Sequence, residues 1–207
     1  MNETPSQPFP PAPWHLQGSA CASLWQVAAA SLPQAGPAPL RLAGRLLVLT
    51  VWARYTEGTL AYDELALAVL QRARPAPSLT VGPIWVSDSH AAAGGRALWS
   101  IPKVLGEFTT CTSDRRFTGQ LSQAGTAIAT LEFTSRMALP GRLPLVGHAL
   151  QRGAAGHLCS ARCSARGRLV LGNAAWDFSA EGPLSFLRGR RPLASLRLES
   201  LRLVFGT

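Results

Sequence analysis

The chain has 207 residues, a length that suits one domain, and 47% of them are hydrophobic while 15% are charged. This composition belongs to globular proteins and excludes a disordered chain. Because no stretch approaches about 18 uninterrupted apolar residues, and because the start "MNETPSQPFPPAPW" has no basic or apolar segment, we expect neither a membrane span nor a signal peptide. We therefore expect a single domain over residues 1–207 in the cytoplasm, with residues 1–18 as a Pro-rich N-terminal arm.

The net charge of +9 is the feature that would fit a nucleic-acid-binding protein. Residues 141–207 carry ten arginines and three acidic residues, yet most of these arginines are spaced along strand-like sequence such as "SLRLESLRL". No nucleic-acid-binding motif accompanies them. A solvated strand face accounts for this pattern, and we expect no nucleic acid among the partners.

Pro and Gly clusters divide the first half of the chain into short elements. Residues 21–30 and 44–58 predict strands, and the second is too apolar on both faces to lie at a solvated edge. The period then changes, and residues 62–74 predict a short amphipathic helix that ends before Pro75. Residues 79–89 predict another strand.

The middle of the chain predicts a loop, a short helix and a hairpin. Residues 90–99, "HAAAGGRALW", predict a loop that carries two glycines. Pro102 is typical of a first helical turn, so residues 102–108 predict a short helix. Residues 115–136 alternate in hydrophobicity on both sides of a turn and predict a hairpin.

The C-terminal strand changes phase along its length. Leu196 and Leu198 share one face, whereas Leu201 and Leu203 have the opposite parity, so a β-bulge near Glu199–Ser200 is needed to reconcile them. Many short strands with turns between them indicate a mainly β (α+β) protein, a barrel or a sandwich, with one or two short helices. Small inward residues would leave space, and space inside a barrel commonly holds a ligand.

A histidine and two cysteines, His157, Cys159 and Cys163, resemble a metal cluster on paper. They fall on one face of an extended strand, where small cysteines commonly face a core. The ligand count is short and the spacing is wrong for zinc. We expect no metal, no cofactor and no disulfide.

The chain contains 19 arginines and a single lysine, Lys103. One explanation is chance: a single lysine can remain in a chain whose composition disfavours lysine. Arginine can also replace lysine wherever a charge or a donor is needed, but only a neutral amine attacks a carbonyl to form an imine. Burial favours the neutral amine, and Trp99, Ile101 and Leu105 supply apolar neighbours. Lys103 is therefore the candidate nucleophile.

The segment that contains "YTEGTLAYDEL" and "IWVSDSHAAAGGRALWSIPKVLGEF" resembles the acetoacetate decarboxylase-like superfamily over about residues 55–108. The matching residues are Tyr55-Thr56-Glu57, Val86, Asp88, Ser89, Gly95-Arg96, Pro102-Lys103 and Leu105. The resemblance implies an antiparallel conical β-barrel, or closed sheet, around an apolar cavity. It also implies that Lys103 forms a Schiff base with a keto acid, and that the protonated imine accepts electrons when carbon dioxide leaves.

The resemblance also assigns roles to other residues. It implies that Glu57 transfers or positions a proton, although a structural salt bridge is the simpler reading. Arg96 either orients a substrate carboxylate or pairs with Asp88 as loop scaffolding. Tyr55 and Trp99 are further candidates for substrate binding.

Two departures from the family pattern bear on the substrate. Decarboxylases carry a second lysine directly after the nucleophile, where this chain has Val104, and residues 45–52 contain no carboxylate. We predict a Schiff-base lyase acting on a small or medium keto acid, either decarboxylase-like or aldolase/dehydratase-like. The alternative is a non-catalytic barrel of the same kind that binds an apolar small molecule. Exposed strand edges and the resemblance both favour a homo-oligomer.

Overall fold

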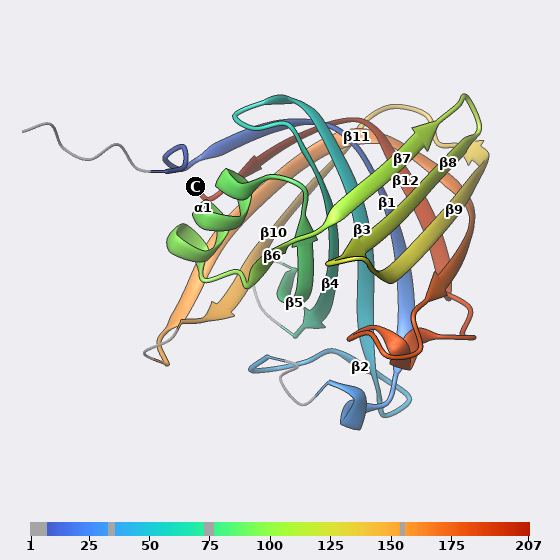
Figure 1. The fold of residues 1–207 in the computed structure, drawn as a ribbon, viewed down its shortest axis with the longest axis horizontal. Helices are drawn as coiled ribbons and strands as arrows, with labels where there is room; N and C mark the ends of the chain where they lie inside the picture. Colours follow the sequence, from blue (N-terminus) through green and yellow to red (C-terminus); the bar gives the residue numbers. More distant parts are fainter. Residues whose placement is uncertain (1–7, 33–35, 73–76, 154–155) are drawn as a thin grey trace, which may run out of the picture.

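The computed structural model describes residues 8–32, 36–72, 77–153 and 156–207, most of which form one mixed sheet of twelve strands (Figure 1). The strands are β1 (Trp14–Val27), β2 (Arg41–Leu42), β3 (Arg45–Gly58), β4 (Tyr62–Gln71), β5 (Ser78–Val86), β6 (Lys103–Leu105), β7 (Glu107–Thr112), β8 (Arg116–Gln123), β9 (Thr126–Ala138), β10 (Leu143–Arg152), β11 (Leu158–Phe178) and β12 (Ala194–Phe205). The helical elements are α1 (Ser89–Trp99) and the 3-10 turns η1 (Ala29–Ser31) and η2 (Ser185–Leu187). The predicted mainly β fold with a short helix is confirmed.

Part of the sheet closes into a ring. Its strands follow the order β5-β4-β3-β1-β12-β11, and β10 closes the circuit by pairing with both β11 and β5. The β10–β5 contact is parallel and spans two residue pairs, and the short β5–β6 contact is parallel as well. The amide of Gln151 extends the closure, because it accepts from the backbone N–H of Val81 at 3.1 Å and donates to its carbonyl at 3.0 Å.

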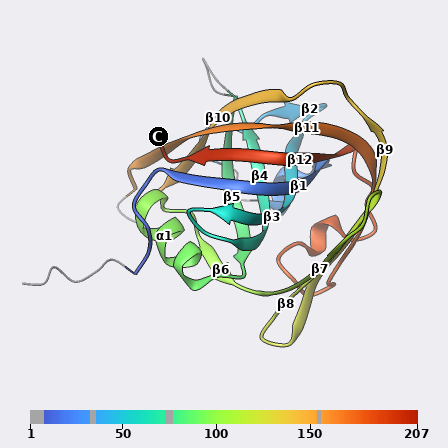
Figure 2. The ribbon, with the colours of Figure 1, turned by 90° about the horizontal axis from the view of Figure 1, so that it is seen from above.

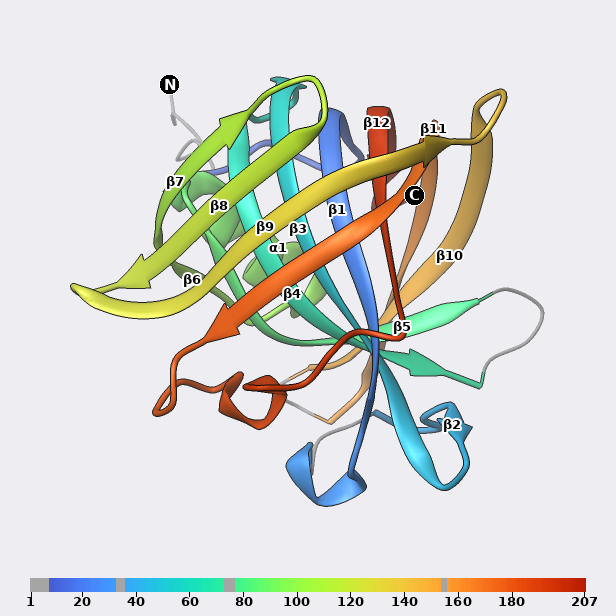
Figure 3. The ribbon, with the colours of Figure 1, turned by 90° about the vertical axis from the view of Figure 1, so that its right-hand side faces the viewer.

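The strands β7, β8 and β9 form a wing that branches from the ring. The first half of β11 pairs with β10 inside the ring, whereas its second half pairs with β9. The wing crosses the outer face of β3, β1 and β12 (Figures 1 and 3). A core rich in aromatic side chains, among them Trp25, Trp52, Phe117, Phe133 and Phe178, fills the space between the ring and the wing.

A second core lies inside the ring, with α1 at one side of the molecule and η2 at the other (Figure 2). Strands of the ring wall are therefore buried on both faces. In β4, Leu65 and Leu67 face the wing, whereas Tyr62 and Ala66 face the ring interior. The helix predicted over residues 62–74 is wrong for this reason: a strand between two cores has no polar face, so its sequence does not alternate. Residues 73–74 lie outside the described part.

The segment around Lys103 reverses two further predictions. Residues 90–99, expected as a loop, belong to helix α1, whose first turn is capped by the Asp88 carboxylate accepting from the N–H of Ala91 at 2.8 Å. The helix ends at Ser100, which has a φ of 56°, and the chain then runs extended. The helix predicted over residues 102–108 is wrong, because the chain continues as β6 and β7, and β6 pairs with β5.

The remaining strand predictions are confirmed by β1, β3, β5 and the β8–β9 hairpin. The C-terminal bulge is present as well: Gly18 pairs with Leu201 and Ala20 with Leu198, and Ser200 between them has a φ of 48°. Residues 14–18, expected in the N-terminal arm, begin β1, and residues 1–7 of the arm lie outside the described residues. No helix in the described part of the chain is long and apolar enough to cross a membrane.

Candidate active site

Lys103 points into the ring interior. It is the first residue of β6 and pairs with Ile84, whose side chain belongs to the inner core. Residues opposite each other on paired strands face the same side of a sheet, so the lysine shares that face. Its side chain is only 6% exposed. The one lysine of the chain is thus a buried amine.

The counter-ion of Lys103 is Glu64, on β4. The Lys103 Nζ to Glu64 Oε2 distance is 2.8 Å, and the glutamate side chain is 13% exposed. The sequence reading missed Glu64, because it lay within a segment interpreted as a helix. One signal was available: Glu64 stands in the otherwise apolar run "ELALAVL", and a carboxylate buried in such a strand needs a cation.

Two tyrosines complete the surroundings of the amine. Lys103 Nζ donates to the Tyr62 hydroxyl at 3.2 Å and lies 5.0 Å from the centre of the same ring. Tyr55 packs against Tyr62 with their ring centres 4.9 Å apart, and the ring of Trp14 lies 5.7 Å from Nζ. Burial is the main cause that raises the pKa of both tyrosines well above 10, and the negative charge of Glu64 raises it further. Both hydroxyls therefore stay protonated.

Helix α1 holds the lysine in place. A Cβ on Gly95 would lie 2.5 Å from Lys103 Cδ, so only glycine lets the lysine stem cross the helix this closely. Arg96 Nη1 donates to the backbone carbonyl of Lys103 at 2.6 Å. The partner of Arg96 is thus that carbonyl and not Asp88, whose carboxylate caps the helix.

Glu57 does not meet Lys103. Gly18 pairs with Tyr55 but Gln17 pairs with Glu57, so β3 contains an extra residue at Thr56. This bulge reverses the facing of the strand, and Glu57 points outward and is exposed while Tyr55 points inward.

Trp99 is separated from the Lys103 amine by the ring of Trp14. Its ring centre is 4.8 Å from that of Trp14 and 4.7 Å from that of Phe205. Trp14 in turn covers Gly94 of α1, where a Cβ would lie 2.5 Å from the indole. These contacts make Trp99 part of the packing that closes this end of the ring.

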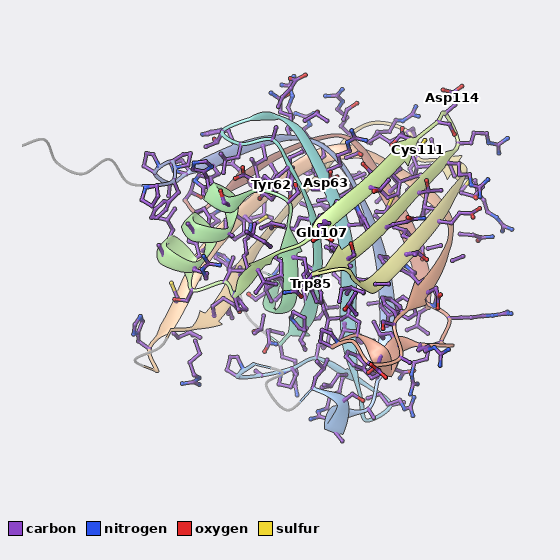
Figure 4. The ribbon with its side chains drawn as sticks, in the orientation of Figure 1. Tyr62, Asp63, Trp85, Glu107, Cys111 and Asp114 are labelled. Atoms are coloured by element: carbon purple, nitrogen blue, oxygen red, sulfur yellow. The ribbon has the colours of Figure 1, made fainter. Side chains whose placement is uncertain are left out.

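Lys103 does not line either of two hollows in the described structure, which have volumes of about 310 and 320 Å³. The first is a surface hollow that Glu57 helps to line. Figure 4 shows Tyr62 close to α1, with Cys111 and Asp114 at the distant tip of the wing.

The cysteine and histidine cluster of the sequence does not form a metal site. Within the described ranges no group of three or more His, Cys, Asp or Glu side chains is placed to hold a metal ion, and the four cysteines are free.

Burial is the main cause that raises the pKa of Cys163 to about 11, and the charge of Glu64 contributes to the rise. Cys163 is therefore a neutral thiol beside the ring interior at pH 7.

The site combines a buried amine, a carboxylate within proton-transfer distance and two protonated phenols inside a β ring. A carboxylate at this distance can take the proton that an amine must lose before it attacks a carbonyl. A model of the acetoacetate decarboxylase family matches residues 1–148, more than half of the chain. The chain belongs to the acetoacetate decarboxylase family.

Solved structures of this family share the fold. An acetoacetate decarboxylase superposes with a TM-score of 0.73 at 18% identity over 100% of this chain and 92% of that one. The acetoacetate decarboxylase from Legionella pneumophila gives 0.72 at 15%, over 97% and 87%. The enduracididine biosynthesis enzyme MppR, in complex with pyruvate, gives 0.68 at 16%, over 97% and 91%. At these identities the likeness concerns the fold alone. A search of curated proteins finds no significant match.

Proposed function

We propose that this protein forms an imine between Lys103 and a small, pyruvate-like keto acid. The observation that carries the proposal is the 2.8 Å contact between the only lysine and Glu64 in the ring interior. The pyruvate complex of MppR supports the choice of substrate class. Glu64 takes the proton-transfer role that the sequence suggested for Glu57.

The first step needs a neutral amine. A proton passes from Lys103 Nζ to Glu64 Oε2, and the nitrogen lone pair then attacks the substrate carbonyl carbon. The carbonyl oxygen takes up that proton and a second proton from nitrogen and leaves as water, while the carbon–nitrogen double bond forms. Tyr62 and Tyr55 remain donors throughout, which suits them to hold the substrate's oxygens.

The protonated imine then acts as an electron sink. Breaking the bond to a β-carboxylate releases carbon dioxide, and removing a proton from the neighbouring carbon yields an enamine for aldol or dehydration chemistry. Val104, at the position of the second lysine of decarboxylases, is 39% exposed and pairs with Trp85 on the face away from Lys103. Among the described residues, the contacts of the Lys103 amine are Glu64, Tyr62 and Trp14, with no second cation. This favours the aldol or dehydration route on pyruvate over decarboxylation of acetoacetate.

Trapping with borohydride tests this function. The protein is incubated with pyruvate or acetoacetate plus borohydride, and the adduct is located by mass spectrometry. Only Lys103 and the N-terminal amine can be trapped, so mass spectrometry assigns any adduct to one of two positions. We expect an adduct at Lys103 that disappears in Lys103→Arg, forms more slowly in Glu64→Gln, and is unchanged in the matched control Glu57→Gln.

A non-catalytic barrel that binds an apolar molecule is the second candidate. It is favoured by the closed state of the site, because Lys103 is ion-paired and the side chain is 6% exposed, so Trp14 or a tyrosine ring must move before a substrate enters. A folded protein that yields no adduct with any keto acid would replace the imine proposal with this one.

A further inference from the structure

The wing ends in a strand with one open edge. β7 is the last strand in the order of the sheet, and among the described residues its only hydrogen-bonded neighbour is β8. The register of β7 against β8 runs from Glu107 to Thr112 without a bulge. β7 lies along the outer rim of the wing (Figures 1 and 3). Its other edge is therefore available for pairing with a further strand.

Every second residue of β7 directs its backbone to this open edge. The N–H of Ser113 donates to the carbonyl of Arg116 at 2.8 Å and closes the β7–β8 hairpin. Hydrogen-bonded pairs alternate along an antiparallel ladder, so Thr109 and Cys111 also exchange hydrogen bonds with β8. The residues of β7 whose N–H and carbonyl groups face the open edge are therefore Phe108, Thr110 and Thr112.

The other end of the sheet is protected against such pairing. The N–H of His148 in β10 donates to the carbonyl of Pro77 at 3.0 Å, and the amide of Gln151 clamps β10 to β5. By the same alternation, Pro144 faces outward beyond this contact, and a proline has no N–H to offer. β7 contains neither a proline nor a basic side chain, which are devices that commonly block a free edge.

The composition of this edge suits a second copy of the chain. Two copies repel each other in general, because the chain has a net charge of +9. β7 contains no Arg, Lys or His, and its one charged residue is Glu107. Antiparallel pairing of two β7 strands places the two glutamates at opposite ends of the interface, about 20 Å apart. Val104 and Leu105, which precede β7, are 39% and 51% exposed, so apolar surface adjoins the start of the strand.

We propose that two copies of this chain join at β7, by antiparallel pairing of their open edges about a two-fold axis at Thr110. In this register Thr110 pairs with the partner's Thr110 and Phe108 with the partner's Thr112, so every group that faces the open edge finds a partner. Thr109 then lies opposite the partner's Cys111 on the exposed face. The proposal is independent of imine formation, because Lys103 faces the ring interior.

Analytical ultracentrifugation of the full chain over a wide range of concentration tests the pairing. We expect a reversible dimer whose dissociation constant rises at least about tenfold in Thr110→Pro, because each copy loses a hydrogen bond at the axis. Proline removes only an N–H that points away from β8, so the wing keeps its own pairing. Thr110→Ala, the matched control, retains that N–H and should dimerise like the unaltered protein. A chain that stays monomeric, or a dimer that Thr110→Pro leaves unchanged, overturns the proposal.

Charged variants keep the proposal testable if Thr110→Pro does not fold. Thr109→Lys combined with Cys111→Lys changes only exposed side chains and brings like charges together across the axis, so we expect a monomer. Thr109→Glu combined with Cys111→Glu should be monomeric for the same reason. An equimolar mixture of the two proteins should restore dimers, because opposite charges then face each other. A mixture that remains monomeric contradicts the pairing of β7 with β7.

Cys111 reports the register directly. It is the exposed one of the four free cysteines, as its place at the tip of the wing shows (Figure 4). In the proposed register the two Cys111 residues are diagonal neighbours, about 7–8 Å apart, so a short bifunctional maleimide should link the two chains. Cys111→Ser should abolish the link. A dimer that cannot be linked through Cys111 has its contact elsewhere and overturns the proposal.

Discussion

Glu64→Gln removes the charge that balances Lys103 while keeping the shape of the side chain. In the native protein the two charged atoms are 2.8 Å apart, and the side chains are 13% and 6% exposed. After the change, Lys103 retains the Tyr62 hydroxyl at 3.2 Å and the two aromatic rings, but no anion. The lysine then becomes a buried cation without a counter-charge.

The size of the effect follows from this burial. Removing one partner of a buried ion pair costs about 3–5 kcal/mol, and the glutamine oxygen still accepts a hydrogen bond, so we expect a loss of about 2–4 kcal/mol in the free energy of unfolding. In a chain of this length, each kcal/mol shifts the melting temperature by about 2–4 °C. The expected fall is about 5–15 °C.

Chemical and thermal denaturation measure this loss, and a double-mutant cycle assigns it. If the pair is the cause, Lys103→Met combined with Glu64→Gln is more stable than Glu64→Gln alone, because no unpaired charge remains. Glu57→Gln, at an exposed position, is the control and should stay within about 0.5 kcal/mol of the unaltered protein. A Glu64→Gln protein that is equally close to the unaltered one would refute the ion pair, and with it the proton-transfer role of Glu64.

Two further predictions concern the packing around Lys103. Gly95→Ala would gain about 1 kcal/mol from helix propensity, yet its Cβ would lie 2.5 Å from Lys103 Cδ. We therefore expect denaturation to show a net loss of about 1–3 kcal/mol in the free energy of unfolding, and borohydride to trap Lys103 more slowly. A more stable variant with unchanged trapping would contradict this. The only two tyrosines, Tyr55 and Tyr62, have pKa values raised above those of the unfolded chain, so stability is fully present below about pH 10 and declines above it, as the unfolded chain loses protons that the folded one keeps. An alkaline absorbance titration should therefore show tyrosinate only together with unfolding, and tyrosinate in the folded protein at about pH 10.5 would contradict the burial.

The sequence carried reliable information wherever one face of an element meets a core and the other meets solvent. The hairpin over residues 115–136 alternates for this reason, and the phase change at Ser200 marked a bulge that the structure contains. Composition singled out Lys103, because the chain has 19 arginines and one lysine. Arginine can supply a positive charge at any position, so a single remaining lysine indicates a role that needs an amine. Local pattern was sufficient for these features.

Local pattern failed where distant parts of the chain meet. Residues 62–71 contain good helix formers but lie between two cores as β4, so a tertiary context that buries both faces overrides their propensity. The two glycines of α1 led us to predict a loop. In the structure, the absence of a side chain at Gly94 and Gly95 lets Trp14 and Lys103 pack closely against the helix. A contact between a helix and a strand leaves no local trace in either segment.

Composition, alternation and the single lysine thus determined the mainly β class and the candidate nucleophile by themselves. The tertiary structure decided which carboxylate pairs with that lysine. One extra residue in β3, at Thr56, turns Glu57 outward, while the pairing of β4 with β5 brings Glu64 to the face that Lys103 shares. The facing of a strand side chain alternates with a period of two, so a single bulge reverses it, and only the register of the folded sheet reveals on which side each residue lies.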